Sequence, residues 1–266
     1  MKLLKYIILS IIQGFTEPLP ISSSGHIRII KSIINDGVLS DLNFEIIVNF
    51  GSLIAIIILY RKEIFNIIND FFKYIKTKNK IYKENYKHAW MIVIGTIPVM
   101  LIGLLIKDFL ENYFTTKFIG LALILTAFLL YLIKDKNGYK TKKDITIKDA
   151  LIIGLYQSIA LLPGISRSGT TLVGSINQNL TRKDALNYSF MLYIPVSIGS
   201  AILGVTDIIT SQNINELIVP YILSAIISGI VTYYSAKLFI NITKKGKLIY
   251  FSIYCLIIGL IVFIAF

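Results

Sequence analysis

The sequence predicts an all-α polytopic membrane protein built as an inverted-topology repeat. The chain has 266 residues, of which 55% are hydrophobic, and its mean hydropathy is +0.71. Several apolar runs reach the roughly 20 residues that a membrane-spanning helix needs. Two polar stretches, 13–26 and 157–171, interrupt this pattern and align with each other without a gap. We therefore expect each half to hold one re-entrant helical hairpin and three transmembrane helices.

The composition favours a single integral membrane domain over residues 1–266, with repeat one at about 1–133 and repeat two at about 145–266. The net charge is +12, but the basic residues lie between apolar runs, so membrane topology explains them better than a nucleic-acid partner does. Lys2 and Lys5 precede an apolar run that resembles the start of a signal peptide. No small-residue cleavage pattern follows, so we expect this segment to be retained.

The first predicted hairpin surrounds the first polar stretch. Residues 3–16 form an apolar helix that is too short to span a bilayer comfortably. This helix must end near Glu17, because Pro18 disfavours helix at the residue before it and Pro20 breaks it again. The serines at 22–24 can cap a second short helix over about 22–34. Such a hairpin is tolerated in a membrane when it is buried in protein or lines a cavity.

The remaining elements repeat this plan. A second broken pair of helices is predicted at about 148–162 and 166–180, around Pro163 and Gly164. Apolar length predicts six full spans, at about 43–60, 89–106, 118–133, 185–206, 217–240 and 248–265.

The basic residues predict the orientation of the spans. Lysine and arginine concentrate in the segments 61–88 and 134–149, which we expect to be loops, and again near 182 and 245. These segments fall on one side if each hairpin returns to the side that it entered. By the positive-inside rule that side is cytoplasmic. The loops 107–117 and 207–216 and both termini would then face outward.

A shift of 144 positions superimposes the two polar stretches. Its pairs are Gln13 with Gln157, Ile21 with Ile165, Ser22 with Ser166, Ser24 with Ser168, and Gly25 with Gly169. Serine and glycine are common in membrane helices, so chance likeness is the alternative, but five matches in one ungapped register beside proline breaks favour a repeat. Three spans after each hairpin is an odd number, so the halves insert with opposite topology and a site is expected at their interface.

The polar residues of both stretches suit a phosphate. Helix N-termini offer free N–H groups and a partial positive charge. The candidate phosphate-binding residues at these positions are Ser22, Ser24, Gly25, Ser166, Ser168, Gly169 and Thr171. Arg167 is the only basic residue in either polar stretch, and a guanidinium suits bidentate phosphate contact. A snorkelling arginine is the alternative reading.

Three further residues suggest metal or proton chemistry. A buried Glu17 could hold a divalent cation or take a proton, or it could bond to the hairpin backbone. Gln13 lies one turn earlier on the same helix face and could offer a neutral oxygen to a metal, but it cannot act as a base. His26 follows the serines and suits acid–base or nucleophilic work, although a lone histidine is often a satisfied buried residue.

These motifs carry a resemblance to a known family. The motif Gln13-x-x-x-Glu17, the run from Pro20 to His26 and the run from Pro163 to Thr171 closely resemble the undecaprenyl-diphosphate phosphatase family of the bacitracin-resistance type. The resemblance covers essentially the whole chain. It implies a multi-pass inner-membrane hydrolase whose site opens to the outer face. Such an enzyme removes the terminal phosphate of undecaprenyl diphosphate, recycles the lipid carrier for peptidoglycan and other wall polymers, and confers bacitracin resistance.

The resemblance also implies roles for single residues. Glu17 matches the second acid of the family's E/Q-x-x-x-E motif and Gln13 the first position, so both become candidate ligands for Mg²⁺ or Ca²⁺. His26 matches an essential histidine, Arg167 an essential arginine, and Ser23 a serine proposed as nucleophile. The expected catalytic set is therefore Glu17, Ser23, His26 and Arg167. The attacking group is left open among Ser23, His26 and an activated water.

A polyprenyl-phosphate transporter is the main alternative from another class, because facing hairpins in inverted repeats also suit alternating access. An enzyme should release phosphate in detergent, whereas a transporter should need sealed vesicles and leave its substrate intact. Expected partners are the lipid substrate and membrane lipids, without nucleic acid, and a homodimer is left open.

Overall fold

The structure is a computed structural model that describes residues 2–34, 42–112, 114–209 and 214–266. These residues form ten α-helices and no multi-residue strand, which confirms the all-α prediction for the described ranges. The helices are α1 (Lys2–Thr16), α2 (Ser23–Ile34), α3 (Leu42–Thr77), α4 (Lys83–Asn112), α5 (Thr116–Leu132), α6 (Ile147–Ile159), α7 (Arg167–Asn177), α8 (Arg182–Ile209), α9 (Ile214–Lys244) and α10 (Ile249–Ala265).

The apolar helices support a multi-pass membrane protein. In the described ranges, four segments are long and apolar enough to cross a membrane: Asn43–Thr77, Lys80–Ile106, Arg182–Gly204 and Leu217–Lys244. Two of the six predicted spans, α5 and α10, are shorter, with 17 residues each. A 17-residue helix is about 25 Å long, at the lower limit for a span. The predicted outer loops 107–117 and 207–216 lie partly outside the described residues.

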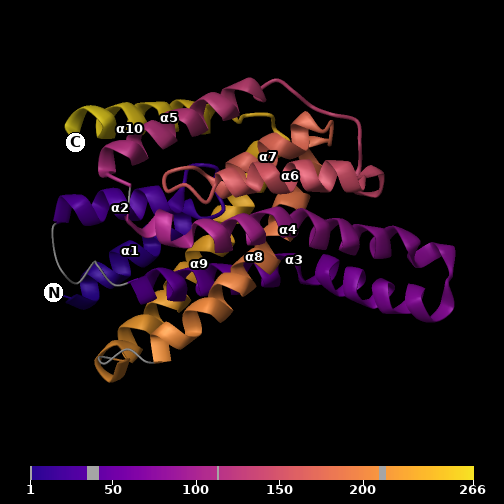
Figure 1. Ribbon diagram of the computed structural model, residues 1–266, viewed down its shortest axis with the longest axis horizontal. Coiled ribbons are helices and arrows are strands. Elements are labelled where there is room, and N and C mark those ends of the chain that lie inside the picture. The colour runs from indigo at the N-terminus through magenta and orange to yellow at the C-terminus, as the bar shows by residue number, and fades with distance from the viewer. Residues whose placement is uncertain (1, 35–41, 113, 210–213) are drawn as a thin grey trace.

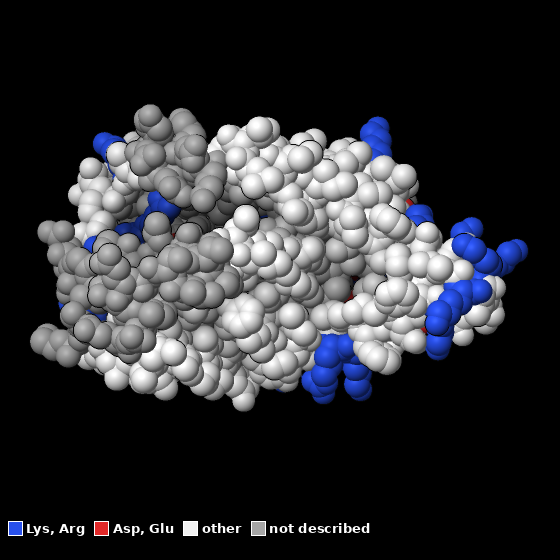
Figure 2. Space-filling view, turned by 60° about the horizontal axis from the view of Figure 1, so that its bottom comes forward, with Lys and Arg blue, Asp and Glu red and all other residues white. Residues whose placement is uncertain are grey.

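The predicted loop at 61–88 is wrong. Helix α3 continues to Thr77 and α4 begins at Lys83, so most of this segment is a helical arm. The charged residues after 60 predict the end of the span, but lysine and glutamate are good helix formers, so the helix continues. Rings also pack across the arm, with centroids 5.1 Å apart for Phe71 and Tyr86 and 4.6 Å apart for Tyr74 and Tyr86. The arm projects at the right of Figure 1, and Figure 2 shows basic side chains gathered at its end.

The two helical hairpins form where the proline breaks predict them. Helix α1 ends at Thr16, one residue before Glu17, and α2 begins at Ser23. Helix α6 ends at Ile159 and α7 begins at Arg167. Each intervening turn needs one residue with positive φ, which is Ser22 (φ +67°) in the first and Gly164 (φ +92°) in the second. Both hairpins therefore present a helix N-terminus directly after a tight polar turn.

Small residues let the long helices approach closely around the hairpins. A Cβ atom at Gly51 of α3 would lie 2.1 Å from the carbonyl oxygen of Ala225 in α9. Beside this crossing, the buried hydroxyl of Thr232 donates to Ser52 Oγ (2.8 Å) and lies 3.1 Å from the Gly14 carbonyl of α1. Close backbone contact and interhelical hydrogen bonds are the main attractive forces between helices in lipid. These contacts fix α1, and with it the first hairpin, against α3 and α9.

The α3–α9 crossing gives a testable prediction on stability. Substituting Gly51→Ala should lower the midpoint of thermal unfolding in detergent, because the added methyl group meets backbone that cannot move away and overpacking costs about 1–3 kcal/mol. The control is Gly199→Ala in α8, where a Cβ atom meets nothing within 4 Å. This change should leave the midpoint unchanged or raise it, since alanine favours helix by roughly 0.5–1 kcal/mol. Equal effects at both glycines would contradict the crossing.

Candidate functional site

The tips of the two hairpins touch each other. The Ser168 hydroxyl donates to the carbonyl oxygen of Leu19 at 2.8 Å. A Cβ atom at Gly25 would lie 3.2 Å from the Cα atom of Gly164. The prediction that the two polar stretches meet is therefore confirmed, and a side chain at position 25 would press against the second tip.

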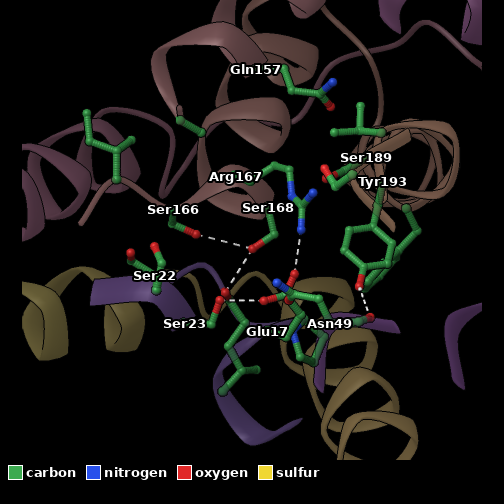
Figure 3. Close-up of a pocket in the computed structure, with 18 of the residues that line it drawn as sticks. Glu17, Ser22, Ser23, Asn49, Gln157, Ser166, Arg167, Ser168, Ser189 and Tyr193 are labelled. Atoms are coloured by element: carbon green, nitrogen blue, oxygen red, sulfur yellow. Dashed lines mark hydrogen bonds and ion pairs between the residues drawn. The ribbon is translucent and has the colours of Figure 1, made fainter. Parts of the chain in front are cut away.

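A cavity of about 190 Å³ lies where the tips meet, and Figure 3 shows its lining. Both hairpins, α3 and α8 contribute polar side chains to it. These are Gln13, Glu17, Ser22, Ser23, Ser24, Glu45, Asn49, Gln157, Ser166, Arg167, Ser168, Ser189, Tyr193 and Ser200. A pocket this polar inside a largely apolar chain is costly unless it binds something.

Glu17 and Arg167 form an ion pair across the hairpin contact (Figure 3). The Arg167 Nη2 atom lies 2.5 Å from Glu17 Oε1, and only 5% of the Glu17 side chain is exposed. The other carboxylate oxygen accepts hydrogen bonds from the Ser23 hydroxyl and from Gln13 Nε2, the latter at 2.8 Å. One carboxylate thus joins a cation and a hydroxyl that come from different halves of the chain.

The Arg167 guanidinium is held on its remaining sides by α8. Its central carbon lies 4.4 Å from the centre of the Tyr193 ring, a cation–π geometry. Nη1 donates to the Ser197 hydroxyl at 3.4 Å. The Tyr193 hydroxyl donates in turn to the Asn49 carbonyl oxygen of α3, also at 3.4 Å. These contacts fix the direction of the guanidinium fork, which is the property that bidentate anion binding requires.

The same cap opens both second helices. Ser22 Oγ accepts a hydrogen bond from the Gly25 amide at 3.3 Å, and Ser166 Oγ accepts one from the Gly169 amide at 3.1 Å. In each case the serine satisfies an amide three residues ahead, as an N-cap does. Ser168 Oγ lies 3.2 Å from Ser166 Oγ. Ser168, which bonds to Leu19 of the first hairpin, is therefore also linked to the cap of α7.

Three predicted phosphate ligands have other surroundings. Gly25, Gly169 and Thr171 do not line the cavity as described. The two glycines lie where the tips touch, and the Thr171 hydroxyl donates to the Arg167 carbonyl at 2.9 Å and pairs with Ser189. These residues therefore act on the shape of the site, while Ser22, Ser24, Ser166 and Ser168 face it.

The structure does not bring His26 to the cavity. Its ring stacks on Tyr254 of α10, with centroids 5.6 Å apart and an interplanar angle of 9°. Nδ1 lies 2.8 Å from the Ser22 carbonyl oxygen, which can only accept, so Nδ1 carries the proton. Nε2 then accepts from the Tyr254 hydroxyl at 2.8 Å. Both ring nitrogens are used, and one of them supports the turn at Ser22.

Six polar residues that line the cavity are not among the site residues expected from the sequence: Glu45, Asn49, Gln157, Ser189, Tyr193 and Ser200. Tyr193 and Asn49 lie on α8 and α3, outside the polar stretches, and they are 144 positions apart. That offset equals the shift between the two polar stretches, so the repeat alignment could have identified Asn49 and Tyr193 as equivalent positions. Gln157 was noticed as the partner of Gln13 but not assigned to the site. Its amide is 1% exposed and forms no hydrogen bond among the described residues, so it is free for a ligand.

The donor set can be tested against a divalent cation. No group of three or more His, Cys, Asp or Glu side chains in the described residues could hold a metal ion alone. Gln13 turns its Nε2 toward Glu17 Oε2 (2.8 Å) and Asn49 Oδ1 (2.6 Å), so its own oxygen does not face Glu17. Mg²⁺ commonly binds one or two carboxylates and takes its remaining ligands from phosphate and water. Glu17 would be the carboxylate ligand of such a cation, and Gln13 would join it only after its amide group rotates.

The long apolar helices, with a polar cavity between two helical hairpins, define a multi-pass membrane protein with a candidate site at the hairpin tips. The chain belongs to the family described as bacitracin resistance protein BacA, which it matches over residues 6–261. This result confirms the family resemblance read from the motifs.

Individual relatives match over nearly their whole length. The chain is 42% identical to undecaprenyl-diphosphatase 2 of Bacillus thuringiensis (strain Al Hakam) and to undecaprenyl-diphosphatase 1 of Bacillus licheniformis, covering 98% of this chain and 97% of each relative. It is 40% identical to undecaprenyl-diphosphatase of Oceanobacillus iheyensis, covering 97% of this chain and 95% of that protein.

The buried ion pair predicts strong coupling between its two members. Glu17→Gln and Arg167→Gln should each lower the free energy of unfolding by about 3 kcal/mol, because each change leaves a buried charge without its partner. The double variant should be less destabilised than the sum of the two, with a coupling of about 1–3 kcal/mol. Denaturant titration in detergent measures all four proteins. Additive losses would mean that the pair does not form.

Proposed function

We propose that this protein is an undecaprenyl-diphosphate phosphatase, which hydrolyses the lipid diphosphate to undecaprenyl phosphate and inorganic phosphate. The phosphatase names of relatives at 42% identity over nearly the full chain support this reaction. One observation carries the proposal: a serine hydroxyl donates to a carboxylate that is itself paired with an arginine. Through this reaction the protein would recycle the carrier for wall polymers and confer bacitracin resistance.

The proposed attacking group is the Ser23 hydroxyl. Its proton already points to Glu17, so the carboxylate can accept this proton as the Ser23 oxygen attacks the terminal phosphorus. The anhydride bond then breaks and undecaprenyl phosphate leaves. Glu17 would pass the accepted proton to the leaving undecaprenyl phosphate and become a carboxylate again. It would then deprotonate a water molecule that attacks the phosphoserine, and it would return that proton to the Ser23 oxygen as inorganic phosphate is released. His26 is proposed to hold the Ser22 turn in place.

Other side chains would bind the phosphates. The Arg167 guanidinium and the N-termini of α2 and α7 would neutralise the diphosphate, with Ser22, Ser24, Ser166 and Ser168 as hydrogen-bond partners. The free amide of Gln157 would donate to a phosphate oxygen. A divalent cation, Mg²⁺ or Ca²⁺, is proposed to bind at Glu17 and Gln13, where it would add positive charge next to the phosphates.

We also propose that the two halves form an inverted repeat with the site at their interface. Helices α1 and α2 correspond to α6 and α7 at the 144-residue offset, and each starts within one residue of its counterpart's expected position. The Asn49–Tyr193 contact joins two positions that are equivalent under the same offset. With the basic arm on the cytoplasmic side of the plasma membrane, the site would open to the outer face. The names of the relatives favour this enzyme over a polyprenyl-phosphate transporter.

Arg167 allows a direct test. Arg167→Ala should reduce phosphate release from undecaprenyl diphosphate at least about 100-fold, because it removes the guanidinium that stabilises developing charge. The activity of Arg167→Lys should lie between those of the wild type and Arg167→Ala, because lysine keeps the positive charge but lacks the two-pronged guanidinium geometry. The assay uses purified protein in detergent, with and without a chelator, and the wild-type protein should lose activity with the chelator. A folded Arg167→Ala protein with full activity would refute the phosphate-binding role.

The serines provide the second test. Ser23→Ala should abolish activity, with a loss of about 1,000-fold or more, because the attacking oxygen is removed. Ser24→Ala is the matched control in the same turn, and it should lose at most about tenfold, the value of one neutral hydrogen bond. Acid quenching after addition of terminally ³²P-labelled substrate should trap labelled wild-type protein. If the wild-type protein stays unlabelled and the Ser23→Ala variant is active, the attacking group is water and not Ser23.

A further inference from the structure

A second cavity lies between α3 and α9, away from the hairpins. It is a groove of about 550 Å³ and shares no lining residue with the site cavity. Its lining is apolar apart from two tyrosine hydroxyls at one end. The lining residues are Gly51, Ile54, Ala55, Ile58, Ala225, Ile226, Gly229, Ile230, Tyr233 and Tyr234. Both helices are long and apolar enough to cross a membrane, so a groove between them opens toward lipid.

The groove and the basic residue that follows it on α3 together extend over about the length of one bilayer leaflet. It is closed at one end by the helix crossing, where a Cβ atom at Gly229 would lie 3.0 Å from the Gly51 carbonyl oxygen. Arg61 follows Gly51 by ten residues, which is about 15 Å along a helix. Half of a hydrocarbon core of about 30 Å is the same length. A chain of methylene groups could therefore lie in the groove from the middle of the membrane to its surface.

The open end of the groove carries two cations. Arg61 lies three residues after the lining residue Ile58, and Lys237 lies four residues after the lining residue Tyr233, so they continue the same helix faces. The Lys237 ammonium lies 4.2 Å from the centre of the Tyr233 ring, and both cations act electrostatically on the Tyr233 hydroxyl. Neither cation is paired with a carboxylate among the described residues. Tyrosine and basic residues at one level are typical of a headgroup region.

We propose that this groove binds one phospholipid with a net negative headgroup. One acyl chain would lie along Ile54, Ile58 and Ile230, and the headgroup phosphate would contact Arg61 and Lys237. Two unpaired cations favour an anionic headgroup over a zwitterionic one, whose amine they would repel. In the proposed topology this end faces the cytoplasmic leaflet, where anionic lipids attract basic side chains near the membrane surface. The groove would thus be a lipid site separate from the place where the diphosphate reacts.

Native mass spectrometry of the purified protein tests this site. Protein in detergent is titrated with phosphatidylglycerol or, in a second arm, with phosphatidylcholine. Wild-type protein should retain one phosphatidylglycerol more tightly than any phosphatidylcholine. Arg61→Gln combined with Lys237→Gln should weaken that first binding step at least about tenfold, since two phosphate contacts are lost. Ile230→Trp, which fills the groove, should also weaken it.

Matched controls separate binding in this groove from general attraction between anionic lipid and the basic protein surface. Lys73→Gln combined with Lys76→Gln removes two charges from the arm, and Ile222→Trp adds the same ring at a site on α9 that is equally exposed and outside the groove. Both should bind like wild type. The proposal is overturned if the arm variant loses as much affinity as the groove variant, or if Ile230→Trp binds normally.

Phosphate release by the same variants keeps this test independent of the proposed enzyme activity. The groove variants should retain wild-type hydrolysis of undecaprenyl diphosphate. If Ile230→Trp instead slows hydrolysis of the C55 substrate but not of a short-chain diphosphate, the groove holds the substrate tail, and the phospholipid assignment is wrong.

Discussion

The ion pair between Glu17 and Arg167 is the contact on which the site depends. It joins the two hairpin tips, and each member comes from a different half of the chain. The close approach at Gly25 and Gly164 and the bond from Ser168 to Leu19 bring the tips near enough for the pair to form. A charge at this depth is tolerated because its partner and its hydrogen-bond donors are built into the neighbouring turn.

The surrounding helices hold this contact in position from two sides. Tyr193 of α8 covers the guanidinium and bonds to α3, while Thr232 of α9 bonds to the backbone of α1. These supports are hydroxyl groups and rings rather than further charges. Hydroxyl groups and rings cost less free energy to bury than charges do, and they still fix the direction of the Arg167 side chain. The site is therefore rigid at its cationic end, while its serines sit at helix ends where backbone amides are available.

Much of this arrangement can be read from sequence because its causes are local. Proline breaks fix the hairpin turns, and the ungapped match of Ser22 to Ser166 predicts equivalent caps. Contacts made by tertiary packing could not be read in the same way. His26 lies beside the serines in sequence, but its ring turns to Tyr254, 228 positions away. The charged residues beyond Arg61 predict a loop, but aromatic rings that pack between α3 and α4 continue both helices into an arm.

Gln157 and Glu17 together suggest how the pocket responds to its ligand. The guanidinium of Arg167 is neutralised by an internal counter-ion, Glu17. In the proposed reaction, a phosphate that binds Arg167 would therefore compete with this carboxylate. It would also give the Gln157 amide a hydrogen-bond partner, which this amide lacks among the described residues. The carboxylate released by that exchange would be the group next to the Ser23 hydroxyl, so ligand binding would be coupled to activation of the attacking oxygen.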